Sequence, residues 1–386
     1  MSSPRSIPTV DRISALPDNI ICHTLSFLPT KQSAATSILS KRWYPLWHSV
    51  LTLDFDDQNF TDFATFSRFV YSVMLSRNIT LPLQAFRLKC GSSSGFNPHD
   101  VNIFIEAAVQ RGVENLDIDM FHRGYSFKLP LCVFSCSNLT VLKLKAMKMH
   151  ELFHVNFPLL KTLHLEAIDI KDSNGRSLWI LLYGCPILEE LQTNGFLFRR
   201  KLKAGRDFNG LHKLVRANIM NLGCSVPFDL VRNAKFLRAK LNYPNYDYQV
   251  PTFPNLTHME IAFDTYEWPG KWKLLTEVLQ NCPKLQSLTI HEDYKYRQEI
   301  GIGDNNWVDL PIVSECLSSQ LRTCSIIGYK GMKCELQFVE YILKNAKVLH
   351  TMKINASLVD INMKYQMLMK LSLCPRGSTT CVLSFD

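Results

Sequence analysis

A short apolar pattern that recurs along most of the chain restricts its fold more than any other feature. Each copy reads apolar, two variable residues, apolar, one variable residue, apolar, as in NLTVLKL, PLLKTLHL and PKLQSLTI. The steps between copies run from 20 to 36 residues. The first apolar positions are Val50, Leu83, Val113, Leu139, Leu160, Leu188, Leu214, Phe236, Leu256, Leu285, Leu321 and Leu349. Such a period is typical of leucine-rich repeats.

This pattern predicts an α/β fold. The alternating part of each copy forms a strand whose alternate side chains point into the core, and the longer return contains a helix or a turn. Each unit leaves an apolar face that only the next unit covers, so the units stack into a solenoid with a parallel sheet. We therefore expect the leucines to be core residues. Functional residues are expected at the variable, outward strand positions and in the loops at the strand ends.

The first fifty residues have a different pattern. Apolar residues recur every three to five positions from Leu16 to Leu28, which predicts a helix with one apolar stripe. Pro17 suits a first helical turn, and Pro29 ends the helix. A second helix is expected over Lys31–Leu39, and a third segment follows up to Val50. Three short helices cannot bury this much apolar surface among themselves, so part of it is expected to face a neighbour.

The motif LPDNIICHTLSFLP, followed by SKRWYPLW, resembles the F-box of plant F-box proteins that also carry leucine-rich repeats. In that family the F-box docks on a Skp-type adaptor, which bridges to a cullin and a RING subunit. The resemblance implies a non-catalytic substrate receptor of an SCF-type ubiquitin ligase. It implies these adaptor-binding residues: Leu16, Pro17, Asp18, Ile20, Leu25, Leu28, Lys31 and Trp43. The target would bind the concave face of the repeats, through residues that the sequence leaves unknown.

The last eighty residues resemble the FBD region at the C-terminus of many such proteins. The resemblance implies a helix at Glu335–Ala346, a strand through Met352 and Ile354, and a close at Pro375–Arg376 and Cys381. This region would cap the open apolar end of the repeats. The predicted organisation is therefore an F-box at 11–51, leucine-rich repeats at 52–306, and an FBD region with terminal repeats and cap at 307–386.

Composition indicates the compartment. The 386 residues are 46% hydrophobic and 20% charged, so the chain can bury a large core. The N-terminus lacks the apolar run of a secretory signal, and the longest apolar stretch, Leu178–Leu188, is too short to cross a bilayer. Twelve cysteines without a C-x-x-C pair are expected to be reduced core residues, with a structural zinc site as the alternative. We expect a cytoplasmic or nuclear protein without membrane contact or cofactor.

The net charge of +9 does not indicate specific nucleic-acid binding. Each of the three predicted parts carries a charge of +3, whereas duplex binding needs one dominant basic face. One local basic run remains, with a solvated loop, nuclear import or an acidic partner as its interpretations. Its members are Arg199, Arg200, Lys201, Lys203 and Arg206.

One catalytic motif competes with this interpretation. The sequence HELFH, from His150 to His154, fits the H-E-x-x-H pattern of zinc proteases, in which two histidines one helical turn apart bind the metal. The motif lies in a short return between two predicted strands, which leaves little room for the long helix that such a site needs. Gly301-Ile302-Gly303 lacks the third glycine of a dinucleotide loop. We therefore expect no metal and no catalytic residue.

A second hypothesis from another functional class stays open. The protein would then be a repeat protein that binds a small ligand or a polyanion outside any ubiquitin ligase. Lys143, Lys145 and Lys148, clustered around one predicted strand, would supply a basic site. Ligand-dependent stabilisation without adaptor binding would favour this hypothesis.

Overall fold

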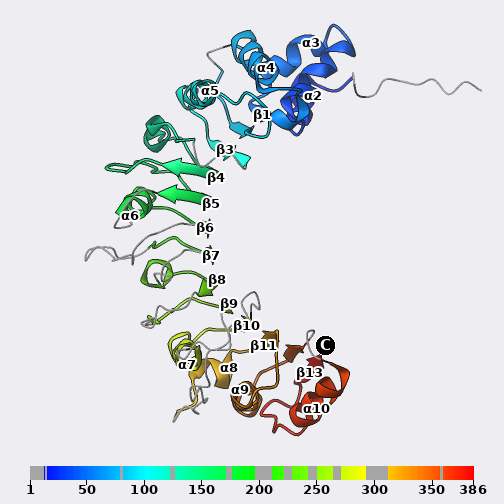
Figure 1. Ribbon diagram of the computed structural model, residues 1–386, viewed down its shortest axis with the longest axis vertical. Coiled ribbons are helices and arrows are strands. Elements are labelled where there is room, and N and C mark those ends of the chain that lie inside the picture. Colours follow the sequence, from blue (N-terminus) through cyan, green and yellow to red (C-terminus); the bar gives the residue numbers. More distant parts are fainter. Residues whose placement is uncertain are drawn as a thin grey trace, which may run out of the picture. The chain divides into compact units, whose positions relative to one another are not determined.

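The computed structural model describes residues 13, 15–78, 81–121, 127–170, 176–195, 211–220, 228–241, 250–263, 271–292, 312–356 and 360–386. The chain forms two compact units, Met1–Met147 and Lys148–Asp386. Within each unit the strands follow one another in chain order and pair in parallel, which confirms the predicted leucine-rich-repeat architecture (Figure 1).

The first unit begins with short helices. These are α1 (Asp18–Leu25), α2 (Thr30–Ala35), the 3₁₀ turn η1 (Thr36–Ile38), α3 (Trp43–Leu46) and the 3₁₀ turn η2 (Trp47–Ser49). Pro17 and Pro29 stand directly before α1 and α2, in extended conformations that cannot continue a preceding helix. The order of the helical segments agrees with the prediction, but α1 ends at Leu25 and not at Pro29, and α2 ends at Ala35, where the 3₁₀ turn η1 begins.

Four strands follow in the first unit: β1 (Thr52–Asp56), β2 (Ala85–Lys89), β3 (Asn115–Asp119) and β4 (Val141–Met149). Their returns contain η3 (Asp57–Asn59), α4 (Phe63–Ser76), α5 (Pro98–Gln110) and η5 (Leu131–Ser135). The two long helices start at side-chain caps. Asp62 accepts a hydrogen bond from the Thr65 amide at 2.7 Å, and Asn97 accepts one from the His99 amide at 3.1 Å.

The buried carboxylate of Asp57, just after β1, fixes the loop that follows β2. It accepts hydrogen bonds from the amides of Gly91, Ser92 and Ser93 at 2.9 to 3.2 Å, and from the Ser92 hydroxyl at 2.5 Å. Asp57 has no exposed surface. Gly91 has φ +111°, and a Cβ there would lie 2.6 Å from the Met120 carbonyl oxygen, so this turn requires glycine.

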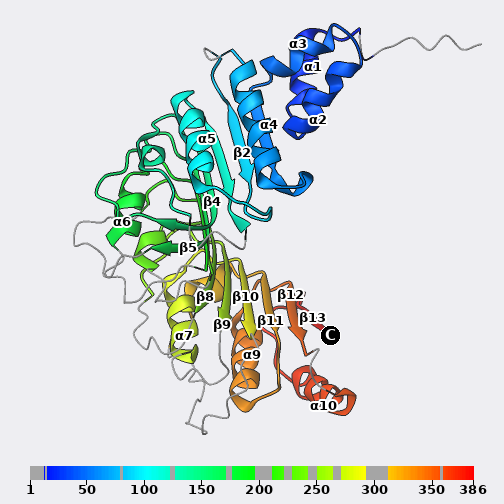
Figure 2. The ribbon, with the colours of Figure 1, turned by 45° about the horizontal axis from the view of Figure 1, so that its top comes forward.

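The second unit carries the remaining strands. They are β5 (Thr162–Ile170), β6 (Glu190–Asn194), β7 (Arg216–Met220), β8 (Phe236–Leu241), β9 (His258–Phe263), β10 (Ser287–Glu292), β11 (Thr323–Ile327), β12 (Thr351–Asn355) and β13 (Val382–Phe385). The helical returns are α6 (Arg176–Tyr183), η6 (Phe228–Val231), α7 (Lys271–Asn281), α8 (Glu315–Ser319), α9 (Lys333–Asn345) and α10 (Ile361–Ser372). Figure 2 shows α7 and α9 on the same side of the strands β8 to β12.

The predicted inward residues form the core in every copy but one. In the copy that contains β4, for example, Leu139, Leu142 and Leu144 are all buried. The prediction for β8 was wrong by two residues. Phe236 was assigned to the core, but the buried triplet begins at Ala234, because the pairing aligns Phe236 with the outward His258 of β9. Alternation has a period of two, so a shift by two preserves the apolar pattern and hides the error.

The C-terminal region has the predicted helix and strand, and adds two elements. Six side chains of α9, between Glu335 and Leu343, are buried, and β12 pairs with β11 as a further repeat. The predictions did not include α10 or β13, which pairs with β12 and ends the sheet of this unit. Within the described residues, no helix combines the length and apolar character needed to span a bilayer.

Candidate functional site

The N-terminal helical module, which runs from α1 to η2, has a small core of its own. It consists of Ile21, Leu25, Trp43, Leu46 and Val50, with Cys22, Leu28 and Trp47 partly buried against it. Two of the predicted adaptor-binding residues are therefore buried inside the module and not on its surface. Leu25 is 1% exposed and Trp43 is 6% exposed, so both stabilise the module from inside. Leu28 is half-buried at the same core.

The other predicted residues lie on the outside. Leu16 and Ile20 keep 36% and 44% of their surface exposed, and Pro17, Asp18 and Lys31 are exposed as well. The single predicted stripe thus divides into a buried half and an exposed half. The division follows from helix geometry, because Ile20 and Ile21 point about 100° apart on α1.

More apolar side chains are exposed on this module than the stripe predicted. They are Ile13, Phe27, Ile38, Leu39 and Tyr44, between 62% and 86% exposed. Ile13 and Phe27 lie seven residues to either side of Ile20, a helical spacing that the predicted stripe left out, whereas Ile38, Leu39 and Tyr44 do not continue this spacing. Single exposed apolar residues are ordinary, but groups of them mark candidate interaction surfaces, and this module has seven large ones within 32 residues.

Arg42, from the SKRW motif, fixes the start of α1 and was not among the predicted residues. Its guanidinium donates to the Leu16 carbonyl oxygen at 2.5 Å and to the Asp18 carboxylate at 2.5 Å. The Asp18 carboxylate is therefore held in position by Arg42, which directly precedes α3. The pair is solvent-exposed, so its value is orientation more than stability.

Lys31 also has partners within the chain. Its ammonium group donates to the Asn59 carbonyl oxygen at 2.8 Å and lies 4.2 Å from the centre of the Phe60 ring. Arg77, 5% exposed, binds the carbonyl oxygens of Trp47 and Val50, and burial lowers its pKa to about 10. Both contacts join the helical module to the first repeats.

The outward face of β1 to β4 is a ladder of alternating charge. Register places Asp54, Arg87, Asp117 and Lys143 in one row, and Asp56, Lys89, Asp119 and Lys145 in the next. Opposed charges approach each other at 3.6 to 3.8 Å, as in the pairs Arg87–Asp54, Lys89–Asp56 and Lys145–Asp119. We call these eight residues the charge ladder. Its charges cancel.

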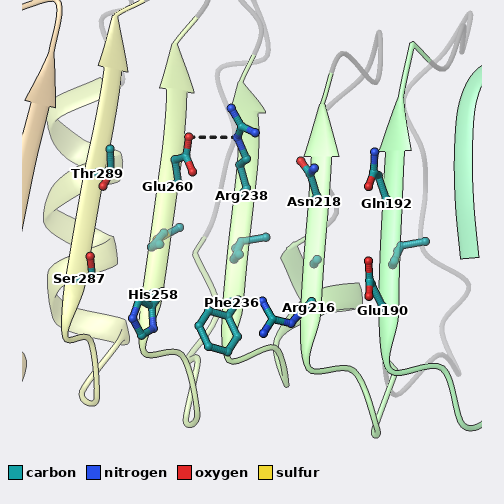
Figure 3. Close-up of a pocket in the computed structure, with 14 residues that line it drawn as sticks. Glu190, Gln192, Arg216, Asn218, Phe236, Arg238, His258, Glu260, Ser287 and Thr289 are labelled. Atoms are coloured by element: carbon teal, nitrogen blue, oxygen red, sulfur yellow. Dashed lines mark ion pairs between the residues drawn. The ribbon is translucent and has the colours of Figure 1, made fainter. Parts of the chain in front are cut away.

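The outward face of β6 to β10 is hollowed instead. A hollow of about 320 Å³ is lined by two rows of outward side chains (Figure 3). One row is Glu190, Arg216, Phe236, His258 and Ser287, and the other is Gln192, Asn218, Arg238, Glu260 and Thr289. These ten residues are called the β6–β10 hollow below. Sequence reasoning had placed functional residues on this face but named none of them.

An aromatic stack occupies the first row of the hollow. The Phe236 ring lies over the His258 ring, with 4.7 Å between ring centres, and the Arg216 guanidinium carbon lies 4.5 Å from the Phe236 ring centre. In the second row, Arg238 Nε lies 3.0 Å from Glu260 Oε1. His291 Nε2 lies 2.7 Å from the same oxygen. Glu260 therefore has two basic side chains beside it. Arg216, by contrast, is exposed to solvent.

The H-E-x-x-H segment does not form a helix. His150 to His154 follow the end of β4 in an irregular stretch, so the two histidines are not one helical turn apart. Leu152 is buried, and its amide donates to the Ser177 hydroxyl at 3.0 Å. The metalloprotease hypothesis fails on this geometry. Across the described part of the chain, no group of three or more His, Cys, Asp or Glu side chains is placed to hold a metal ion.

The basic-site hypothesis loses its main support. Lys145 pairs with Asp119 at 3.8 Å, and Lys143 stands opposite Asp117 in register. Two of the three lysines therefore belong to the neutral charge ladder. The basic run from Arg199 to Arg206 and the Gly301-Ile302-Gly303 segment lie outside the described residues.

These parts define a class of protein: a helical module with exposed apolar side chains, followed by leucine-rich repeats and a closing helix-and-strand region. Family models match each part. Residues 13–54 match the F-box domain, residues 101–204 match the leucine-rich repeats of the FBD-associated F-box protein At5g56370, and residues 312–354 match the FBD domain.

Relatives from Arabidopsis thaliana match over nearly the whole chain. The F-box/FBD/LRR-repeat protein At4g26340 is 31% identical over 98% of this chain and 100% of its own length. The FBD-associated F-box protein At5g56370 is 31% identical over 97% of this chain and 100% of its own length. The F-box/FBD/LRR-repeat protein At5g56420 is 30% identical over 97% of this chain. The chain belongs to the family of F-box/FBD/LRR-repeat proteins.

Proposed function

We propose that the protein is the substrate-recognition subunit of an SCF-type ubiquitin ligase. The observation that carries the proposal is the F-box module, which has its own core and yet exposes seven large apolar side chains. A Skp-type adaptor would cover them and link the chain to a cullin and a RING subunit. The repeats would bind a target protein.

The adaptor contact would centre on the exposed residues at the start of α1. Leu16, Pro17 and Ile20 would be buried by the adaptor, with Asp18 held at the rim by Arg42. Leu25 and Trp43 would act indirectly by keeping the module folded. Burying an exposed leucine or isoleucine contributes about 1 to 2 kcal/mol. The start of α1 would therefore decide affinity.

In this proposal the chain performs no chemistry itself. It would raise the rate of ubiquitin transfer by holding the target close to a conjugating enzyme that other subunits carry. A reducing cytoplasmic or nuclear location belongs to the proposal. The eleven cysteines among the described residues are all free, and burial raises the pKa of thiols such as Cys185, to about 12, which leaves them unreactive.

The direct test is binding of the purified full-length chain to a Skp-type adaptor. The double variant Leu16→Ala/Ile20→Ala should weaken binding at least tenfold, because both side chains are exposed and their loss spares the core. Leu75→Ala is the matched control, since Leu75 is an exposed leucine on α4, 83% exposed and outside the F-box module. Absence of adaptor binding by the wild type, or equal binding by the double variant, would refute the proposal.

A further inference from the structure

The residue that distinguishes the β6–β10 hollow from the rest of the outward face is Arg216. Register places it directly opposite Glu190 on the neighbouring strand, a position that would allow an ion pair. The pair is not formed. The Glu190 carboxylate lies 2.8 Å from His164 Nε2, while the Arg216 guanidinium lies over the Phe236 ring. Among the described residues, no carboxylate comes within ion-pair distance of Arg216.

Stacking on Phe236 prepares this guanidinium for a planar anion. An arginine that lies over an aromatic ring keeps its N–H donors free at the edge of the guanidinium plane, in the fork arrangement that matches a carboxylate. Phe236 is itself supported on its far side by His258, at 4.7 Å between ring centres. The side chain therefore loses little rotamer freedom when it binds.

The surrounding charges favour a single negative charge over a double one. Glu190 stands directly opposite Arg216 in register, so a dianion bound at Arg216 would meet a carboxylate of its own sign. Arg238 is engaged with Glu260 at 3.0 Å and is not available as a second cation. One exposed guanidinium beside Glu190 matches a ligand with a single carboxylate.

The dimensions of the hollow suit an extended peptide. It crosses the five strands β6 to β10, which at about 4.8 Å between neighbouring strands is a width of roughly 19 Å. About six residues of extended chain cover that distance at about 3.3 Å per residue. Polar side chains line the second row, among them Gln192, Asn218 and Thr289, which can bind peptide N–H and C=O groups.

We propose that the β6–β10 hollow binds an extended acidic segment of the target protein, with a glutamate or aspartate side chain of that segment against Arg216. The rest of the hollow then contributes contacts along the segment, and Phe236 packs against its apolar atoms. This inference rests on the proposed function, because it takes the ligand to be part of a target protein. It deepens that function by naming the chemistry that selects the target.

The test uses the full-length chain and an array of nonapeptides with both ends capped and random flanking positions. The central residue is glutamate in one set, glutamine in the second and phosphoserine in the third. Wild-type protein should retain the glutamate set about tenfold more strongly than the glutamine set, and more strongly than the phosphoserine set. Arg216→Gln should abolish the preference for glutamate, and Arg216→Lys should keep only part of it, because an ammonium group lacks the fork geometry.

Arg87→Gln is the matched control, since Arg87 is an exposed arginine on the same kind of outward strand position in the charge ladder. It should leave the preference unchanged. Retention of no peptide, equal retention of glutamate and glutamine sets, or a preference that survives Arg216→Gln would overturn the inference. A stronger retention of the phosphoserine set would overturn the assignment of a carboxylate.

Adaptor binding separates this inference from the proposed function. Arg216→Gln should bind the adaptor as the wild type does, because Arg216 lies in the repeats and not in the F-box module. A chain that prefers acidic peptides through Arg216 but binds no adaptor would refute the ligase role and keep the peptide site. Adaptor binding without a preference for acidic peptides would refute the peptide site and leave the ligase role standing.

Discussion

The charge ladder on β1 to β4 and the β6–β10 hollow occupy equivalent strand positions but differ in one pair of opposite charges. In the ladder, residues of opposite sign stand side by side and pair, as Arg87 does with Asp54 and Asp117. In the hollow, Glu190 and Arg216 stand side by side and turn away from each other. The same register can therefore pair two neighbouring charges or leave them apart, and in the hollow the Arg216 guanidinium lies over the Phe236 ring of the next strand instead.

The largest effect is expected at Asp57, the buried carboxylate that directly follows β1 of the charge ladder. Asp57→Ala removes the acceptor of three amides and a hydroxyl, so it should lower the free energy of unfolding by about 3 kcal/mol. Asp56→Ala is the control, because the adjacent Asp56 carboxylate only pairs with Lys89 and accepts one hydrogen bond from the Gln58 amide at 2.9 Å, so this variant should lose about 1 kcal/mol. Chemical denaturation measures both. Equal losses of stability in the two variants would contradict the prediction that the buried carboxylate of Asp57 stabilises the fold more than the ladder carboxylate of Asp56.

A charge reversal tests whether the ladder is a paired surface. Arg87→Glu places three carboxylates side by side with Asp54 and Asp117, so it should destabilise the chain by about 1 to 2 kcal/mol at low salt. The loss should shrink clearly in 0.5 M NaCl, because exposed charges are screened. Arg87→Gln should cost less than half as much. A salt-independent loss would mean that Arg87 contributes through packing and not through charge.

Loss of the aromatic support tests the hollow from the other side. Phe236→Ala frees Arg216 to turn towards Glu190 and form the pair that the register permits, as in the ladder. Affinity for an acidic peptide selected from the array should then fall about threefold to tenfold, since stacking and pre-organisation are both lost. Fluorescence anisotropy with labelled peptide gives the Kd. Unchanged affinity would show that Arg216 needs no aromatic support.

The sequence predicted the strands well because the apolar triplets are local and repeated. It could not predict the hollow, because outward positions carry no pattern and their meaning depends on which residues the register places side by side. The two-residue error in the predicted core positions of β8 illustrates this. With Phe236 assigned to the core, the row from Glu190 through Arg216 to His258 had no aromatic member, and nothing indicated a site. In the F-box, likewise, the stripe predicted apolar surface but not which half stays exposed.

The smallest effect concerns Asp54, at the edge of the ladder. Its carboxyl pKa is raised above the usual value because partial burial outweighs the attraction of Arg87. A carboxyl whose folded pKa is raised favours folding below its unfolded pKa, and that contribution is lost as the pH rises through the folded pKa. Asp54→Asn should therefore change stability at pH 7 by less than about 1 kcal/mol, and in the stabilising direction if the amide keeps the neighbouring contacts.

Titration of the Asp54 carboxyl by NMR checks the cause directly. The wild type should titrate above the ordinary aspartate range, and Arg87→Gln should move the pKa further upward, because the attraction that opposes burial is removed. A pKa below the ordinary range in the wild type would mean that pairing dominates burial. The ladder would then be a source of stability, and the contrast with the hollow would lie in energy as well as in arrangement.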